Sequence, residues 1–261
     1  MEIIKDIHVE IGNCLDLFKN VPDNSVKLVV TSPPYNIKKN YGKYNDDVSL
    51  EEWKDLIDNV TKEVYRVLTD DGSFFLNLSQ IPYGKDKEIL PLQYIGYEIA
   101  KNNNFYLRNM ITWTFNGMQN PTLRLAGRYE NIMWAVKDLN NYIFNLDDIR
   151  IPYITKNDKR LTGKGRNPTD VWYFDHVNNM TKKKLGLTHP TIYPVEMIER
   201  IIMMSSNEGD TILDPFLGSG TTAVAAKNLN RKAIGFELDS EYLPEIVKRI
   251  KYESKQSELD L

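Results

Sequence analysis

Residues 211–222 read TILDPFLGSGTT, and this stretch decides the fold. A short apolar strand at 211–213 runs into a turn that carries Gly218 and Gly220, and a helix of small residues follows. Glycines let the backbone approach a ligand closely, and the N-terminus of the next helix supplies unpaired amides for a carboxylate or phosphate. Glu237 ends the next predicted strand about 20 residues later, where an acid can bind ribose hydroxyls. The stretch therefore indicates a nucleotide-type site; the alternative is a tight turn whose glycines serve packing alone.

Strands and helices alternate on either side of this stretch. Apolar runs predict four core strands, at residues 7–11, 26–30, 73–77 and 232–236. Ser49 and Glu52 form a capping box that opens an amphipathic helix over 50–68, and 110–115 and 131–136 are expected to pair antiparallel at a sheet edge. Residues 36–48 are interpreted as a long loop and 70–72 as a turn. This alternation predicts an α/β fold with a mostly parallel sheet and helices on both faces.

Composition excludes several classes of protein. The chain has 261 residues, 41% of them hydrophobic, and a net charge of −3, which is ordinary globular usage. No apolar run approaches the roughly 20 residues of a membrane helix, and the first residues lack the layout of a signal peptide. We therefore expect a cytoplasmic protein without a membrane partner. Cys14 is the single cysteine, which excludes an internal disulfide and a zinc site built on several thiolates.

A second motif, Thr31-Ser32-Pro33-Pro34-Tyr35, follows the predicted strand at 26–30. Its two prolines rigidify a turn at the carboxyl end of a strand, which is where open α/β sheets bind ligands. Such a turn can aim the Ser32 hydroxyl and backbone carbonyls at an amino group. Tyr35 offers a flat face on which a base can stack, worth roughly 1–3 kcal/mol. The alternative is a Pro-Pro loop with a surface tyrosine.

Together the two motifs resemble those of the DNA amino-methyltransferases that use S-adenosylmethionine. Residues 31–35 look like the catalytic motif, 214–221 like the cofactor loop, and 189–194 (HPTIYP) like the segment before that loop. The catalytic motif precedes the cofactor loop, as in the β group, whose chain is a circular permutation of the others. The resemblance implies a permuted Rossmann-like methyltransferase fold. One catalytic domain is then formed by 1–137 and 189–261, with a small basic target-recognition region at 138–188.

The resemblance also implies a set of site residues, with no metal. The catalytic set is Ser32, Pro33, Pro34 and Tyr35. The cofactor set is Asn13, Thr31, Thr191, Asp214, Pro215, Phe216, Gly218, Ser219, Gly220, Thr221, Thr222 and Glu237. The chain departs from the family at two positions, since Asn13 stands where relatives commonly carry Asp and Tyr193 where they often carry Lys.

The implied reaction is direct methyl transfer to an exocyclic amine of a base flipped out of duplex DNA. Ser32 and the Pro33 carbonyl would accept hydrogen bonds from the amine while Tyr35 stacks on the base. Methylation of a ring carbon would need a thiolate, and Cys14 does not lie in a Pro-Cys loop. In this family Ser at the first motif position goes mainly with cytosine N4, so we expect that target, with adenine N6 as the alternative.

Between Arg150 and Pro190 the chain carries nine Lys or Arg and three Asp, a local charge of 9 − 3 = +6. We expect this stretch to recognise DNA, because cations contact phosphates and base edges. The candidate DNA-binding residues are Lys38, Lys39, Lys156, Arg160, Lys164 and Arg166. A solvated basic loop is the alternative reading.

Other functions are also compatible with the motifs. RNA or a protein glutamine could accept the methyl group, although such relatives generally carry Asn-Pro-Pro-Tyr and place the cofactor motif first. A non-catalytic DNA- or nucleotide-binding module is the reading from another class. Expected partners are duplex DNA, a cognate restriction endonuclease in a restriction–modification system, and a second copy of the chain as a homodimer. The expected location is the prokaryotic cytoplasm, associated with the nucleoid.

Overall fold

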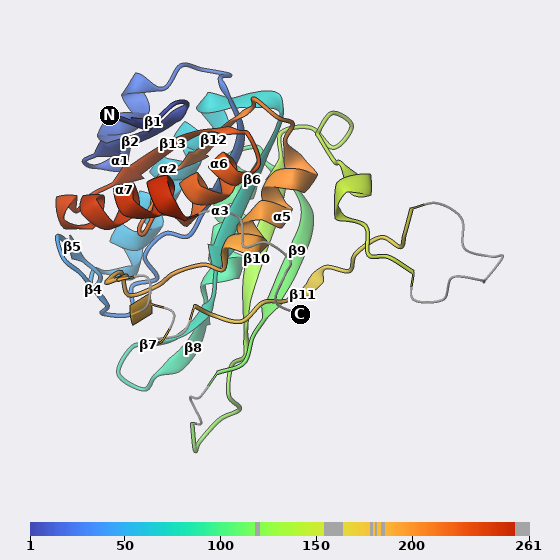
Figure 1. The fold of residues 1–261 in the computed structure, drawn as a ribbon. Coiled ribbons are helices and arrows are strands. Elements are labelled where there is room, and N and C mark those ends of the chain that lie inside the picture. The colour runs from blue at the N-terminus through green and yellow to red at the C-terminus, as the bar shows by residue number, and fades with distance from the viewer. Residues whose placement is uncertain (118–120, 154–163, 178–179, 181, 184–185, 254–261) are drawn as a thin grey trace.

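The computed structural model describes residues 1–117, 121–153, 164–177, 180, 182–183 and 186–253. These residues form a nine-stranded sheet in the order β1-β2-β13-β12-β3-β6-β10-β9-β11 (Figure 1). In that order the strands are Glu2–Ile4, Ile7–Ile11, Lys232–Glu237, Thr211–Asp214, Val26–Thr31, Leu68–Leu78, Tyr129–Val136, Tyr106–Thr114 and Val171–Tyr173.

Five neighbouring strands run parallel to one another, in the order β2, β13, β12, β3 and β6. β10 is antiparallel to β6, β9 is antiparallel to β10, and β1 is antiparallel to β2. β11 then pairs parallel with β9. The predicted mostly parallel α/β fold is therefore confirmed, and its antiparallel part is larger than a single edge strand.

Helices cover both faces of the sheet and give it two hydrophobic cores (Figure 1). One face carries α1 (Cys14–Leu17), α2 (Leu50–Val67) and α3 (Leu92–Asn102), and the other α5 (Val195–Ser205), α6 (Thr221–Asn228) and α7 (Leu243–Tyr252). Successive strand residues point to opposite faces. In β6, Phe74 and Leu76 therefore join the core under α2 and α3, whereas Phe75 joins the core under α5.

The capping box predicted at the start of α2 is present. The Glu52 amide donates to Ser49 Oγ at 3.2 Å, and the Ser49 amide donates to the Glu52 carboxylate at 2.9 Å. The two bonds satisfy amides that have no partner inside the helix. The helix thus begins where the sequence predicts, and its buried face carries Trp53, Ile57 and Val60.

The structure departs from the sequence predictions in the polar segments. The predicted loop at 36–48 contains a small hairpin, β4 (Asn40–Tyr41) with β5 (Tyr44–Asn45), and a second hairpin joins β7 (Gln80–Tyr83) to β8 (Glu88–Pro91). The predicted turn at 70–72 was wrong, because these residues lie inside β6. There the pairing shifts from Val26↔Leu68 to Leu28↔Ser73, so extra residues of β6 are absorbed as a bulge.

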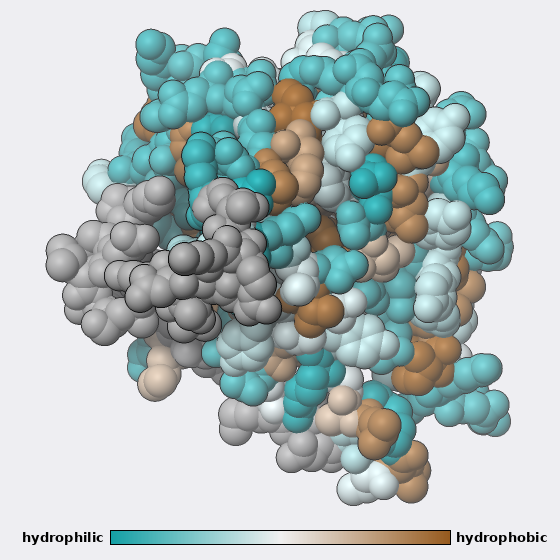
Figure 2. All heavy atoms as spheres, turned by 90° about the vertical axis from the view of Figure 1, so that its right-hand side faces the viewer, coloured by the Kyte–Doolittle hydropathy of each residue, from teal (hydrophilic) through white to brown (hydrophobic). Residues whose placement is uncertain are grey.

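The short 3-10 helices are Phe18–Asn20, Leu146–Ile149 and Ser240–Tyr242. On the side of the molecule that carries β9 and β11, apolar side chains form scattered patches among hydrophilic ones (Figure 2). Scattered exposed apolar residues are normal on a folded protein. Within the described residues, no helix has the length and apolar character to cross a bilayer.

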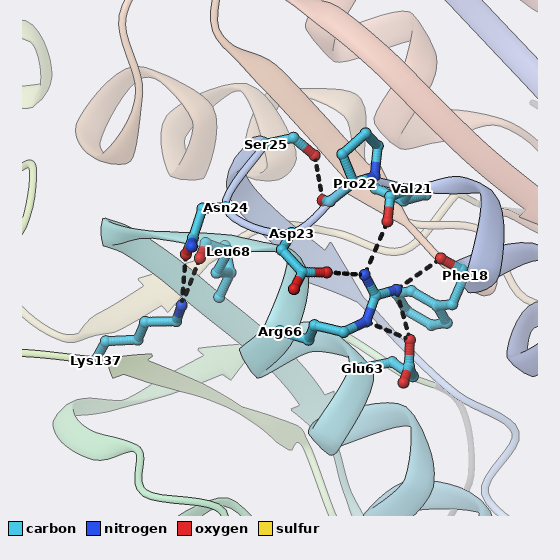
Figure 3. A network of polar contacts seen from close by, with 10 residues as sticks. All are labelled: Phe18, Val21, Pro22, Asp23, Asn24, Ser25, Glu63, Arg66, Leu68 and Lys137. Carbon is cyan, nitrogen blue, oxygen red and sulfur yellow. Dashed lines mark hydrogen bonds and ion pairs between the residues drawn. The ribbon is translucent and has the colours of Figure 1, made fainter.

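Arg66, in the last turn of α2, ties this helix to the chain before β3 (Figure 3). Its guanidinium donates to the carbonyls of Phe18 at 2.7 Å and Val21 at 2.9 Å, and pairs with Glu63 at 2.7 Å. It also forms an ion pair with Asp23. One planar group therefore donates to two backbone carbonyls at this junction, one of which, that of Phe18, also accepts the Val21 amide.

Replacing this guanidinium should destabilise the fold. We expect Arg66→Ala to lower the free energy of unfolding by roughly 2 kcal/mol, because the Phe18 and Val21 carbonyls lose a charged donor. Chemical denaturation of both proteins measures the difference. Lys19→Ala is the control, since Lys19 only meets Asp16 in an exposed pair, and it should unfold like the parent. Equal denaturation midpoints for Arg66→Ala and the parent would contradict the role given to Arg66.

Candidate active site

The two sequence motifs meet at one edge of the sheet. β3, β12, β13 and β6 are parallel, so their carboxyl ends lie together. The helices that follow β3 and β12 cover opposite faces, which makes this the point where the topology switches and α/β sheets bind ligands. A cavity of about 740 Å³ opens there. Its lining includes all the predicted catalytic residues and all the predicted cofactor residues except Thr31 and Gly220.

Asp214, at the end of β12, joins the two motifs. Its buried carboxylate accepts hydrogen bonds from the hydroxyls of Thr31 and Thr222, both at 2.6 Å. It also accepts from the Phe216 amide at 3.1 Å. Burial raises the pKa of Asp214, and these hydrogen bonds oppose that shift. Asp214 and Thr31 therefore fix the cofactor loop against β3, and the carboxylate oxygens are already engaged by the protein.

The glycine turn leaves room for a ligand next to its backbone. Gly218 has φ +55° and Gly220 has φ +86°, conformations that side-chain-bearing residues rarely adopt. A Cβ at Gly218 would stand 3.0 Å from the His189 ring, so the cradle admits no side chain there. The open backbone ends at α6, whose first residues, Thr221 and Thr222, line the cavity.

Glu237, at the end of β13, presents a carboxylate to the same cavity. One oxygen accepts from the Gly218 amide and the other from the Asp239 amide, each at 2.9 Å. Burial raises the pKa of Glu237 to about 7. Each oxygen keeps a lone pair for a further donor. A fixed carboxylate beside the glycine-containing loop fits the ribose and the chain of S-adenosylmethionine.

Arg249 of α7 supports this loop and was not predicted from the sequence. Its buried guanidinium donates to the Ser219 carbonyl at 3.0 Å, to Ser219 Oγ at 2.8 Å and to Thr221 Oγ1 at 2.9 Å. Glu253 balances its charge at 2.6 Å. The side chains of Ser219 and Thr221 are therefore held by the protein. An arginine between Ile246 and Ile250 on the apolar face of the last helix was the sequence signal for this contact.

Asn13 and His189 also have structural roles at the cavity wall. Asn13 caps α1, because its side chain accepts from the Leu15 amide at 3.0 Å. His189 is buried against Gly218, and its Nδ1 contacts the Thr191 carbonyl. Burial lowers the pKa of His189 to about 4, so the ring is neutral at pH 7. Among the described residues, no group of three or more His, Cys, Asp or Glu could hold a metal ion.

The Ser-Pro-Pro-Tyr turn is held rigidly at its far end. The Trp53 indole of α2 donates to the Pro34 carbonyl at 2.7 Å. The Tyr35 hydroxyl lies 3.1 Å from Ser32 Oγ and 3.0 Å from a carboxylate oxygen of Glu130. Burial raises the pKa of Tyr35 well above its usual value, so this phenol keeps its proton. Ser32 itself faces the cavity.

Three polar residues around Ser32 were missed in the sequence. Asn77 lies near the end of β6, Glu130 near the start of β10, and Tyr193 before α5. Because β10 runs antiparallel to β6, its first residues lie at the edge where β6 ends. Asn77 Nδ2 donates to Glu130 at 2.6 Å and to the Tyr35 hydroxyl at 2.7 Å. No local motif marks Asn77 and Glu130, because they meet only through strand pairing. Tyr193 lies in the 189–194 segment but was not predicted to face Ser32.

The predicted DNA-binding residues lie at several places. Lys39 lines the cavity, and Lys38 pairs with Asp47 at 3.0 Å on the exposed surface. Lys164 is exposed and pairs with Asp147 at 3.1 Å, and Arg166 is exposed in a β-bridge with Ile151. The remaining two, Lys156 and Arg160, lie outside the described residues.

Comparison with known proteins places these motifs in a family. The family model described as DNA methylase, N6_N4_Mtase, matches residues 26–248. The chain is 33% identical over 258 residues to type II methyltransferase M.ScaI of Streptomyces caespitosus, covering 96% of this chain and 83% of that protein. It is also 33% identical over 267 residues to DNA adenine methyltransferase YhdJ of Escherichia coli (strain K12), covering 96% and 84% of the two chains.

Among solved structures, PvuII DNA methyltransferase (cytosine-N4-specific) matches with a TM-score of 0.77 at 20% identity. The match covers 96% of this chain and 90% of that one, and it supports the fold. The family model spans both the Ser-Pro-Pro-Tyr turn and the glycine loop. The resemblance drawn from the motifs is thus confirmed: the chain belongs to the N6/N4 DNA methylase family, and its methyl donor is S-adenosylmethionine.

Proposed function

We propose that the protein methylates the exocyclic N4 amine of cytosine in duplex DNA. The observation that carries this proposal is the position of Ser32, whose hydroxyl shares one cavity with the Gly218 loop and Glu237. An amine held at Ser32 therefore faces the methyl donor across that cavity. Membership of the family indicates that the substrate is DNA. The choice of cytosine as the methylated base is the part that we propose.

The protein's part in the reaction is orientation of the amine. Ser32 Oγ and the Pro33 carbonyl accept its two hydrogens, which draws the nitrogen lone pair out of ring conjugation and directs it across the cavity. The Pro34 carbonyl is already occupied by Trp53, so the turn cannot rotate to offer it instead. Orientation of this kind is worth orders of magnitude in rate. The base reaches the cavity by flipping out of the duplex, with the Tyr35 ring as its stacking surface.

The cofactor residues hold the donor in the other half of the cavity. Glu237, fixed by the Gly218 amide, would accept the ribose hydroxyls, and the amides at the start of α6 would bind the carboxylate of the methionyl part. When bound, S-adenosylmethionine supplies a methyl group on a positively charged sulfur. The chain's part in the transfer is to present the amine nitrogen, and one amine proton would leave to water.

Ser32 favours cytosine over adenine, because the resemblance links serine at this position mainly to N4 methylation. The relatives themselves include an adenine enzyme and a cytosine-N4-specific enzyme, so their names leave the base open. The second candidate is therefore N6 methylation of adenine at the same site.

Recognition of DNA is proposed for the basic stretch within 138–188 together with the segment after the catalytic turn. Arg166 and Lys164 are exposed on the first. On the second, Lys39 lines the cavity and Lys38 is exposed. Exposed cations of this kind would neutralise phosphates of the bound duplex. A restriction–modification role with a cognate endonuclease, a homodimer and a place beside the nucleoid remain part of the proposal.

Mass spectrometry of nucleosides tests the proposal directly. The purified protein is incubated with S-adenosylmethionine and unmethylated duplex DNA of varied sequence, and the DNA is digested to nucleosides. We expect N4-methylcytosine to accumulate with time and to be absent without the methyl donor. Finding N6-methyladenine alone would reject the cytosine assignment and keep the second candidate. DNA that is bound but never methylated would instead support a non-catalytic binding module.

A further inference from the structure

A partly buried carboxylate, that of Glu130, lies beside the catalytic turn, outside every motif of the sequence. One oxygen of Glu130 accepts from the Tyr35 hydroxyl at 3.0 Å and from Asn77 Nδ2 at 2.6 Å. Two more polar atoms near Ser32, Asn77 Oδ1 and the Tyr193 hydroxyl, are buried and find no hydrogen-bond partner among the described residues. Unpaired buried polar atoms are rare in native proteins and mark places that a ligand completes.

The chemistry of each group fixes the direction of these hydrogen bonds. A carboxylate only accepts and an amide nitrogen only donates. Asn77 Nδ2, 2.7 Å from the Tyr35 hydroxyl, must therefore donate to it. Burial raises the pKa of Glu130, and the hydrogen bonds from Asn77 and Tyr35 oppose that shift in favour of the carboxylate. Tyr35 has one hydrogen, and this carboxylate oxygen is a stronger acceptor than the Asn77 backbone carbonyl at 3.2 Å. The Tyr35 hydrogen thus points at Glu130.

Ser32 is the last residue in this series of hydrogen bonds. Its hydroxyl lies 3.1 Å from the Tyr35 oxygen, whose hydrogen is already committed, so Ser32 donates its single hydrogen to Tyr35. Only lone pairs of Ser32 Oγ then face the cavity. The same logic turns the Asn77 amide so that its oxygen points away from Glu130. One carboxylate thereby makes the Ser32 hydroxyl an acceptor toward the cavity. The Tyr193 hydroxyl, whose pKa burial raises well above its usual value, keeps its own hydrogen beside it.

We propose that Glu130 is a positioning residue that sets this polarity, so that the site selects a base with an amino group over one with a keto group. An amino group donates a hydrogen bond to Ser32 Oγ, whereas a keto oxygen has no hydrogen to donate and would be repelled by the Ser32 lone pairs. The proposal deepens the proposed function and rests on it, because it assumes that Ser32 receives the amine. It applies equally to cytosine and adenine.

The test replaces Glu130 with methionine, which has a similar length and no acceptor, and with glutamine, which keeps one acceptor oxygen. In Glu130→Met the Tyr35 hydrogen is shared between the Asn77 backbone carbonyl at 3.2 Å and Ser32 at 3.1 Å. Where it turns onto Ser32, the Ser32 hydrogen points into the cavity. We expect kcat to fall about tenfold, with the S-adenosylmethionine Kd and the melting temperature unchanged. Glu130→Gln should retain part of the lost rate. Glu98→Gln, an exposed glutamate on α3, is the matched control and should behave like the parent.

Binding to altered DNA separates polarity from a general structural role. Each duplex carries one of two bases at the target position. One is the unmethylated base that the nucleoside assay identifies as the substrate, and the other is its keto analogue, uracil for cytosine or hypoxanthine for adenine. The cost of flipping belongs to the DNA and cancels when two proteins are compared on the same pair of duplexes. We expect the parent's preference for the amino base to fall about tenfold in Glu130→Met.

Two outcomes would count against different claims. If the parent methylates DNA and Glu130→Met keeps both its kcat and its preference for the amino base, the role of Glu130 is wrong and the proposed function stands. If kcat falls with an unchanged preference, Glu130 serves structure alone and the polarity proposal is overturned. If the parent methylates no DNA, the proposed function fails first. Tyr35→Phe, which removes the relay hydroxyl, should reproduce the loss of kcat and guards against misfolding of the Glu130 variants.

Discussion

Ser32→Ala should lower kcat for DNA methylation roughly 100-fold, because the amine loses the acceptor that orients its lone pair. The change removes one oxygen atom and adds no bulk. The Pro33 carbonyl still accepts one hydrogen of the amine, so some turnover should persist. Single-turnover methylation with saturating DNA and S-adenosylmethionine measures the chemical step without product release.

Cofactor binding distinguishes this effect from damage to the fold. Ser32 makes its hydrogen bond to Tyr35, whereas the Gly218 loop is held by Asp214 and Arg249. The Kd of Ser32→Ala for S-adenosylmethionine should therefore match that of the parent. Ser25→Ala is a matched control, since Ser25 lies before β3 and bonds only to the Pro22 carbonyl at 2.6 Å. Turnover of Ser32→Ala equal to that of Ser25→Ala would remove Ser32 from the mechanism.

Glu237→Ala should weaken binding of S-adenosylmethionine roughly 100-fold at pH 8, because two hydrogen bonds to a carboxylate are lost. The Gly218 amide also loses its acceptor, so the glycine loop is held less firmly. Isothermal titration of the purified protein with the cofactor gives the Kd directly. A Kd within twofold of the parent's would show that the ribose is held elsewhere.

The raised pKa of Glu237 adds a pH dependence with a definite sign. Because burial raises that pKa to about 7, the carboxylate takes up a proton as the pH falls below 7. The protonated group accepts ribose hydroxyls poorly, so the parent's affinity should fall progressively from pH 8 to pH 6. Glu237→Gln mimics the protonated form and should show a weak affinity that varies little over this range. A parent Kd constant from pH 6 to pH 8 would contradict the assignment.

The same shift acts on the stability of the cofactor-free protein. A folded-state pKa above the ordinary glutamate value means that the folded chain holds this proton more tightly than the unfolded chain. Glu237 therefore stabilises the fold relative to the unfolded state at low pH, and this contribution is lost as the pH rises from about 4.5 to about 7. Asp239 adds to the effect, since its charge also raises the Glu237 pKa.

The parts of the site that the sequence revealed are those encoded by neighbouring residues. A β-branched run ending in Ser-Pro-Pro-Tyr places Ser32 at the end of a buried strand, and the glycine pair places an open turn before α6. Local steric rules fix both features, so the carboxyl edge of the sheet and its two motifs could be predicted. The capping box at Ser49 is of the same kind, because both partners lie within one turn of helix.

The parts that escaped prediction depend on contacts between distant segments. Glu130 reaches Asn77 only because β10 pairs antiparallel with β6, and Arg249 reaches Ser219 only because α7 packs beside α6. The turn expected at Asp70-Asp71-Gly72 became strand for a similar reason. Pairing with β3 on one side outweighs the local preference of these residues for a turn, at the expense of a bulge.

The order of strands in the sheet has a consequence for how the protein is made. β2 and β3 are close in sequence, yet β13 and β12 lie between them in the sheet. During synthesis the first two strands emerge early and must wait, with their edges unpaired, until residues 211–237 leave the ribosome and fill the gap. Such long-range pairing forms slowly and leaves edges exposed to aggregation in the meantime. The nascent chain thus has no assembled catalytic edge until residues 211–237 have been translated, and a product truncated before them carries Ser32 without the strands that would place a methyl donor beside it.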